Sequence, residues 1–230
     1  MKQLWIGLSV LLLFVGIRGP DVSMAQDRQK GVGKVSLKWA FAALKESSSG
    51  SELVAIHRET ALSTGDEFKM LLELKDKCYA YVIYQGPRQE IRLLFPYALS
   101  DFEKGLDESK PYYIPKGHGW FELDDVKGSM AFHLVVSVQR LTRLETLLNN
   151  YESARSGEKQ AVAGDLLEEM RQLKRLNTSL KAPAERPAQI IGRVRGNGEP
   201  EQTDIRDIEN LAVEISAENF FSRTFTIDHK

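Results

Sequence analysis

The sequence predicts a mainly β fold, either a β-sandwich or a flattened barrel of antiparallel strands, with two amphipathic helices inserted before the C-terminal strands. Apolar and polar residues alternate with period two over residues 35–43, which is typical of a half-buried strand. Short strand-like segments closed by Gly, Pro or Asp turns recur as far as Ser137. Beyond Leu141 the apolar spacing changes to three and four, which is typical of helices. About seven strands at this spacing indicate two sheets packed face to face.

The first strands follow from this alternation. The apolar face of the opening strand consists of Val35, Leu37, Trp39, Phe41 and Ala43. A turn rich in serine at residues 47–51 precedes a second extended run at residues 53–57, which predicts a hairpin. After a turn at residues 63–66, another strand is predicted by the alternating residues Phe68, Met70, Leu72 and Leu74.

The middle of the chain predicts a strand covered on both faces. Residues 78–84 are almost continuously apolar and aromatic, as expected for a central strand. Residues 91–95 form the next strand, which Pro96 ends, and residues 99–110 read as a long surface loop. Further extended segments are expected at residues 111–115, 120–123 and 132–138. The sandwich core is therefore assigned to residues 35–140.

Two amphipathic helices are predicted for residues 141–181, with a break at Ser156 and Gly157. Their apolar stripes are Leu141, Leu144, Leu148 and Tyr151, followed by Leu166, Met170, Leu173 and Leu180. The prolines at 183 and 187 stop helix formation. In residues 188–230 we expect an extended segment at 189–194, a loop at 196–200, and a closing hairpin made by residues 211–215 and 220–227. This last part is expected to return to the sheet.

The N-terminus has the pattern of a secretory signal peptide over residues 1–25. A basic residue, Lys2, precedes an apolar run at residues 4–17, and small residues stand at −3 and −1 of a cut between Ala25 and Gln26. The run is shorter than the roughly 20 residues of a membrane-spanning helix, although an uncleaved anchor is the alternative. No second run of spanning length follows, so the mature chain is expected in the periplasm or outside the cell, after a flexible leader at residues 26–34.

Composition narrows the classes of function. The formal net charge is −1 with both signs interspersed, so the chain lacks the clustered Lys and Arg that nucleic acid binding requires. Cys78 is the single cysteine, which excludes an internal disulfide. The sequence has no phosphate-binding loop, dinucleotide fingerprint or Gly-x-Ser-x-Gly motif, and its four histidines lack the spacing of a zinc site. We therefore expect neither a cofactor nor a metal.

Seven short motifs occur in an order that resembles one bacterial family. They lie at residues 64–68, 78–82, 91–96, 113–115, 119–121, 134–137 and 144–148. Over most of residues 35–148 the chain is similar to the family catalogued as domain of unknown function 4384. The resemblance implies a mostly β domain, often in exported proteins or attached to signalling, protease-like or repeat modules, and it carries no catalytic residues across. In that family the stretch after the Phe-Pro pair is often rich in asparagine, whereas residues 97–110 have mixed charge here.

Aromatic residues beside the predicted loops are the candidate binding residues. They are Tyr97, Tyr112, Tyr113, Trp120 and Phe121. Aromatic side chains that combine a large apolar area with a polar group are typical of recognition surfaces. Packing in the core or at strand edges is the alternative, because strands also favour aromatic residues. The first hypothesis is therefore an exported, non-catalytic domain that binds a protein or an envelope component.

Two further hypotheses stay open at this point. A hydrolase or thiol-dependent enzyme would use Cys78 as nucleophile with His133 as base, or the loop residue His118, but both Cys78 and His133 stand in apolar runs that favour burial. An assembly protein would oligomerise through the leucine stripes of the helices, which packing on their own sheet also explains. The sequence leaves the oligomeric state open.

Overall fold

The computed structural model describes residues 33–47, 50–177, 183–188 and 208–230, all within the unit Val32–Lys230. The predicted signal peptide, the leader as far as residue 32, the extended segment at 189–194 and the loop at 196–200 lie outside the described residues. No helix in the described part of the chain is long and apolar enough to cross a membrane.

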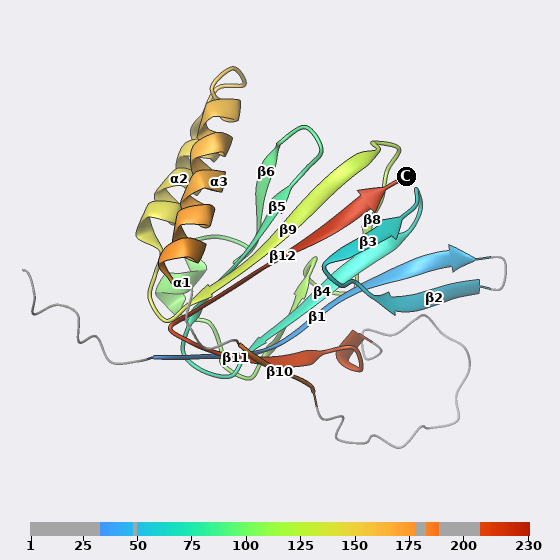
Figure 1. Cartoon of the computed structure of the whole chain (residues 1–230), viewed down its shortest axis with the longest axis horizontal. Coiled ribbons are helices and arrows are strands. Elements are labelled where there is room, and N and C mark those ends of the chain that lie inside the picture. The colour runs from blue at the N-terminus through green and yellow to red at the C-terminus, as the bar shows by residue number, and fades with distance from the viewer. Residues whose placement is uncertain (1–32, 48–49, 178–182, 189–207) are drawn as a thin grey trace, which may run out of the picture. The chain divides into compact units, whose positions relative to one another are not determined.

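The described strands form two sheets (Figure 1). The larger sheet contains β1 (Lys34–Ser47), β2 (Gly50–Ala55), β4 (Glu67–Leu74), β7 (Pro111–Ile114), β8 (Phe121–Glu122), β10 (Ala184–Pro187) and β11 (Val213–Glu218). Its order is β10-β11-β1-β4-β7, with β2 beside β1 and β8 beside β4. The smaller sheet contains β3 (Glu59–Leu62), β5 (Tyr79–Gln85), β6 (Ile91–Phe95), β9 (Gly128–Ser137) and β12 (Phe220–His229), in the order β3-β12-β9-β5-β6.

Both sheets stay open, so the structure decides between the two predicted forms in favour of the sandwich. Their strands pair antiparallel except β3, which runs parallel to β12. The predicted apolar face of β1 is entirely in the main core between the sheets. Phe41 lies at its centre, with its ring centroid 5.0 Å from that of Phe132 on β9 and 5.5 Å from that of Phe225 on β12. The period-two pattern therefore predicted correctly which residues of β1 face the core.

Two longer helices, α2 (Thr142–Ser153) and α3 (Lys159–Leu176), cover the outer face of the smaller sheet (Figure 1). Leu180 of the predicted stripes lies outside the described residues. The others pack on this sheet: Leu144 and Leu166 belong to the same buried cluster as Tyr81 and Ile83 of β5. Since Ala80 and Val82 belong to the core between the sheets, β5 is buried on both faces, as predicted. The helical leucines are thus used within the chain.

A buried polar network fastens the helices to the sheet. The Tyr81 hydroxyl donates to Glu145 Oε1 at 2.6 Å and accepts from the backbone N–H of Leu141 at 3.1 Å. Glu145 also pairs with Arg140, so the carboxylate has charged and neutral partners although only 6% of the residue is exposed. Burial, followed by the hydrogen bond to Glu145, raises the pKa of Tyr81 far above its ordinary value. A satisfied buried network of this kind fixes the helix orientation.

The predicted closing hairpin is wrong. β11 and β12 are both strands, but β11 lies beside β1 in the larger sheet and β12 lies between β3 and β9 in the smaller one. The chain crosses between the layers at Asn219, whose φ of 59° is left-handed. Asn219 exchanges hydrogen bonds with Gly33, donating to its carbonyl at 2.8 Å and accepting its N–H on Oδ1 at 2.6 Å. The Asn219 carbonyl also accepts from Val138 at 3.0 Å, so one residue joins both sheets.

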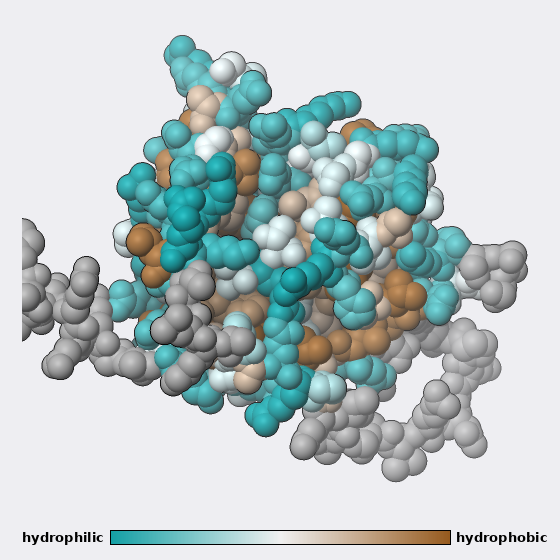
Figure 2. All heavy atoms as spheres, viewed as in Figure 1, coloured by the Kyte–Doolittle hydropathy of each residue, from teal (hydrophilic) through white to brown (hydrophobic). Residues whose placement is uncertain are grey.

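Two smaller differences have similar local causes. The segment around Pro183 and Pro187 was predicted only to stop the helices, but it contains the edge strand β10. Pro187 is tolerated there because an edge strand has one side on which its backbone needs no hydrogen-bond partner from another strand. The predicted surface loop at 99–110 contains α1 (Asp101–Lys104), one turn of helix that buries Phe102 against the helix side of the smaller sheet. The molecular surface seen in Figure 2 is largely hydrophilic, with hydrophobic residues in smaller patches.

Asn219→Ala is expected to lower the free energy of unfolding by about 1–3 kcal/mol, because alanine disfavours the left-handed backbone and loses the bond to Gly33. Asn219→Asp keeps an acceptor oxygen and tolerates this φ, so it serves as the matched control and should stay close to the parent chain. Urea unfolding followed by circular dichroism measures both. Equal losses for the two variants would contradict the role given to Asn219.

Candidate functional site

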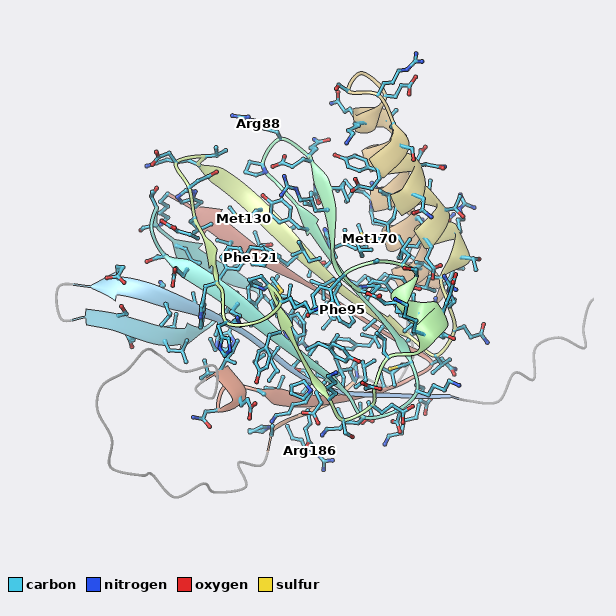
Figure 3. All side chains as sticks on the ribbon, turned by 180° about the vertical axis from the view of Figure 1, so that it is seen from behind. Arg88, Phe95, Phe121, Met130, Met170 and Arg186 are labelled. Carbon is cyan, nitrogen blue, oxygen red and sulfur yellow. The ribbon has the colours of Figure 1, made fainter. Side chains whose placement is uncertain are left out.

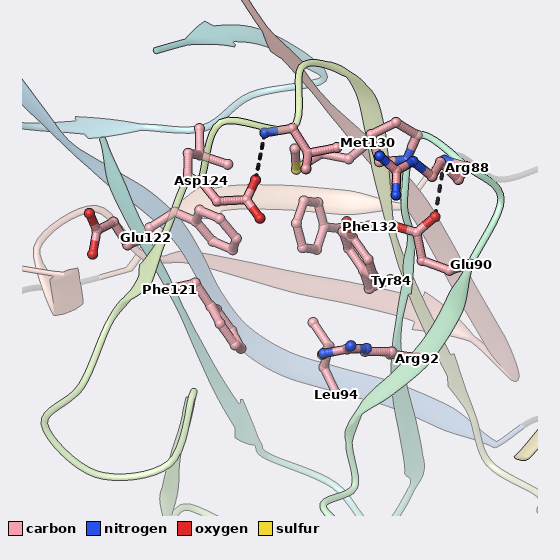
Figure 4. A pocket seen from close by; sticks show the side chains of 14 residues that line it. Tyr84, Arg88, Glu90, Arg92, Leu94, Phe121, Glu122, Asp124, Met130 and Phe132 are labelled. Atoms are coloured by element: carbon pink, nitrogen blue, oxygen red, sulfur yellow. Dashed lines mark hydrogen bonds between the residues drawn. The ribbon is translucent and has the colours of Figure 1, made fainter. Parts of the chain in front are cut away.

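A cleft of about 300 Å³ opens between the two sheets along one side of the sandwich. One wall is the hairpin that joins β5 to β6, and the other is β8 with the loop that leads to β9 (Figure 4). The same region is seen from behind in Figure 3, where Arg88 marks the hairpin tip and Phe121 and Met130 lie along the opening. All of its lining residues come from β4, β5, β6, β8, β9 and the adjoining loops.

The cleft exists because only part of this side of the sandwich is closed. Phe95 at the end of β6 closes one part, since its ring lies 5.1 Å from that of Tyr112 on β7 and 5.6 Å from that of Tyr97. β8, the next strand along β4, has only two residues. The neighbouring wall contains Gly128, whose φ is 137°; a Cβ at this position would lie 2.8 Å from Cβ of Pro87, so no side chain fits.

Four aromatic rings form the floor of the cleft. Phe68 lies centrally, with its ring centroid 5.2 Å from that of Phe121 and 5.3 Å from that of Phe132. Tyr84 lies 5.3 Å from Phe132 by the same measure. These rings come from four strands of both sheets, so the floor continues the aromatic core to the surface. A floor of this kind binds apolar or aromatic groups.

The two walls differ in charge. The hairpin wall carries Arg88, Glu90 and Arg92, whereas the β8 wall carries Asp124, with the Glu122 side chain directed away from the cleft (Figure 4). Asp124 Oδ1 accepts from the backbone N–H of Val126 at 2.9 Å. Within the described residues, none of these charged side chains makes an ion pair. The walls therefore present both charges to whatever enters.

Glu90 affects both the hairpin turn and the phenol of Tyr84. Glu90 accepts from the backbone N–H of Arg88 at 3.0 Å, which holds the hairpin turn. Burial, and then the charge of Glu90, raise the pKa of Tyr84 above its ordinary value, so the phenol stays neutral and can donate a hydrogen bond. Glu67 on β4 stands directly opposite Glu122 in the sheet, on the face away from Phe68 and Phe121, which is an unfavourable pairing of like charges outside the cleft.

The five aromatic residues predicted from the sequence do not form one surface. Phe121 lies in the cleft, while Tyr112 packs on Phe95 beside it. Tyr113 and Trp120 lie on the outer face of the larger sheet, where the ammonium of Lys69 is 5.7 Å from each ring centroid. Tyr97 is 41% exposed and donates to the carbonyl of Tyr113 at 2.7 Å.

Lys69 itself is fully buried, which sequence reasoning missed. Its ammonium donates to the carbonyls of Gly117, at 2.8 Å, and Gly119, so it fixes the loop that carries the exposed His118. Burial lowers the pKa of Lys69. The cleft residues Tyr84 and Arg92 were missed as well, although they stand directly opposite each other on β5 and β6, two strands that the sequence predicts in succession. That pairing is the signal that would have found them.

Cys78 and His133, the sequence-derived nucleophile and base, lie on opposite faces of the smaller sheet. Cys78 belongs to the core between the sheets, where burial, and then Asp76 and Glu108, raise the pKa of the thiol to about 12. His133 stands opposite Ile83, on the face that the helices cover. The described residues contain no group of three or more His, Cys, Asp or Glu side chains that could hold a metal ion.

Residues 61–140 match the model of a family described as Domain of unknown function (DUF4384). This confirms the resemblance stated from the motifs. All residues that line the cleft fall within the matched segment. No curated protein and no solved structure matches the chain.

Cys78 is expected to resist Ellman's reagent in the native state and to react once the chain is unfolded. With a pKa of about 12, roughly one thiol in ten thousand is ionised near pH 8, and only the thiolate reacts. Ser100→Cys places a thiol at an exposed position and should react at once. Native labelling of Cys78 at the rate of that control would show an accessible thiol and reopen the nucleophile hypothesis.

Proposed function

We propose that this protein is an exported, non-catalytic domain that binds an extended segment of a partner protein in the cleft. The observation that carries the proposal is the placement of Arg88 and Arg92 on one wall and Asp124 on the other, above an aromatic floor. A ligand that satisfies all three parts needs a cationic group, an anionic group and an apolar side chain within a short length. A polypeptide segment supplies these without any further chemistry.

The edge of the smaller sheet favours an extended ligand. β6 is the last strand of its sheet and has one strand neighbour, β5. Arg92 and Leu94 of β6 both line the cleft, so a strand added beyond β6 would run along its mouth. Backbone hydrogen bonds to an edge strand provide affinity, and alternate side chains provide specificity. The alternate side chains facing inward would meet the aromatic floor and the acidic wall.

Charge complementarity sets which segment fits. A basic side chain would pair with Asp124 on the β8 wall. An acidic group would pair with Arg88 or Arg92, where a planar guanidinium binds a carboxylate through two hydrogen bonds. An apolar residue between them would cover Phe121. Rim charges of this kind govern partner choice more than total affinity.

Export is supported by the sequence alone. The apolar run at residues 4–17 and the small residues before the cut after Ala25 are typical of a signal peptide. We propose that the mature chain begins at Gln26 and works in the periplasm or outside the cell. A partner would then be another exported protein or a protein of the envelope.

An acetylated hexapeptide that alternates valine with lysine, phenylalanine and glutamate is expected to bind, as measured by isothermal titration and by amide shifts of β6. Phe121→Ala should weaken binding by about tenfold, because the floor loses its outermost ring. Arg92→Glu should weaken it by reversing the charge of one wall. Arg155→Glu, in the exposed turn between α2 and α3, makes the same charge change away from the cleft and should leave binding unchanged.

A second peptide tests the edge pairing. Replacing its valines with proline removes the backbone donors that would pair with β6, and we expect this peptide not to bind. Equal binding of both peptides, or an Arg92→Glu variant that binds as well as the parent chain, would overturn the proposed mode.

The full chain expressed in a bacterium is expected to yield a product that begins at Gln26, as measured by intact mass. Ala25→Arg should block this processing, because the cut requires a small residue at −1. A product that keeps Met1 and sediments with membranes would show an uncleaved anchor and contradict the proposed cleavage.

A further inference from the structure

A second cavity of about 300 Å³ lies between α3 and the outer face of the smaller sheet. Its polar lining comes from four elements and consists of Gln85 on β5, His133 on β9, Ser222 and Thr224 on β12, and Arg171 and Lys174 on α3. Apolar side chains of α3, among them Met170, form the rest of its helical wall (Figure 3). This cavity is on the opposite face of the sheet from the cleft.

The charge of this cavity has one sign. Arg171 and Lys174 face it from α3, and no acidic residue lines it. Arg171 pairs with Glu168 at 3.0 Å, but that pair is exposed, so water and salt screen it. Arg223 also borders the cavity, yet its guanidinium lies over the rings of Phe221 and Phe225 on the core side of β12 and pairs with Glu185. The positive charge at the cavity therefore comes from Arg171 and Lys174 of α3, which are themselves exposed to solvent.

His133 contacts two of the polar side chains that line the cavity. Its Nε2 lies 3.3 Å from Gln85 Oε1 and its Nδ1 lies 3.1 Å from Thr224 Oγ1. Because the amide oxygen can only accept, Nε2 carries the hydrogen of the neutral ring, and Nδ1 then accepts from the Thr224 hydroxyl. Burial, and then the charge of Lys174, lower the pKa of His133 to about 4. The ring is thus neutral near pH 7.

We propose that this cavity binds a tetrahedral oxyanion, a phosphate or sulfate group, between Lys174 and Arg171 of α3 and the hydroxyls of Ser222 and Thr224. Two cations from one helix and two hydroxyl groups from one strand supply charge and directed donors to the same space, as oxyanion binding requires. The cavity is large enough for such a group with part of its ester. This site is independent of the proposed peptide cleft.

Binding is coupled to protonation of His133. A bound anion offsets the charge of Lys174 and raises the pKa of His133, so the protonated ring becomes populated at mildly acid pH. The protonated Nδ1 then donates to Thr224 Oγ1, which turns the Thr224 hydroxyl hydrogen towards the anion. By linkage, affinity must rise as pH falls through the raised pKa and level off above it. The charged groups that face His133 are Lys174 and Arg171 on α3; Gln85 and Thr224 on the strands are neutral.

Sulfate is the appropriate probe, because its charge is constant across the pH range and phosphate's is not. We expect sulfate to bind, as measured by amide and imidazole shifts in NMR, on the order of tenfold more tightly near pH 5 than near pH 7.5. Lys174→Glu should abolish binding. His133→Gln should retain binding but remove its pH dependence. Arg155→Glu is the matched charge reversal outside the cavity and should bind as the parent chain does.

The outcomes separate the alternatives. Absence of sulfate binding at either pH, or equal binding by Lys174→Glu, would overturn the proposal whether or not peptides bind the cleft. A His133 pKa that sulfate leaves unchanged would overturn the coupling. Comparison of inorganic phosphate with glycerol 3-phosphate at one pH distinguishes the sources: tighter binding of the ester supports a phosphorylated metabolite or headgroup, and tighter binding of the free ion supports the ion itself.

Discussion

Phe41 is the point on which the two sheets depend. Its ring meets rings on both sheets, with centroids 5.9 Å from Phe68 on β4 and 5.0 Å from Phe132 on β9. Aromatic rings packed at steep angles add to the apolar area that they bury, so this cluster sets the distance between the layers. The aromatic cluster extends from the core to the cleft at the surface. Phe68 and Phe132 are also the floor of the cleft, so the packing that holds the sandwich together also shapes its candidate site.

Consecutive residues on the strands of the smaller sheet face two different sites. Phe132 and Tyr84 face the core and the cleft, whereas the residues that follow them, His133 and Gln85, face the helices and the second cavity. This division follows from the period of two along a strand. It requires both faces of β5 and β9 to be covered, which the helices achieve through the Tyr81–Glu145 network. Without α3, His133 would stand on an open surface and titrate as an ordinary histidine.

Local pattern predicted the strands and helices well, because each depends on a period that the sequence displays. It predicted the inward face of β1 and the two-sided burial of β5 for the same reason. It failed at Asn219, because predicted strands at 211–215 and 220–227 resemble a hairpin in sequence. Only the left-handed backbone of Asn219 and its bonds to Gly33 send the chain to the other layer. The burial of Lys69 was not predicted either, because a lysine between apolar residues indicates a solvent-facing position. It is buried because a loop supplies carbonyl groups that accept hydrogen bonds from its ammonium.

The sites themselves depend on distant pairings, and this explains why composition gave no indication of them. A formal net charge of −1 describes a chain whose charges are balanced as a whole. In the fold, Asp124 and the arginines of the β5–β6 hairpin are kept apart by the width of the cleft, and α3 directs cations to a cavity that no acidic residue lines. Local segregation of charge, not its sum, determines what a surface attracts. The aromatic candidates failed as one surface for a related reason: Tyr112 and Tyr113 are adjacent in sequence and therefore face opposite sides of the same strand.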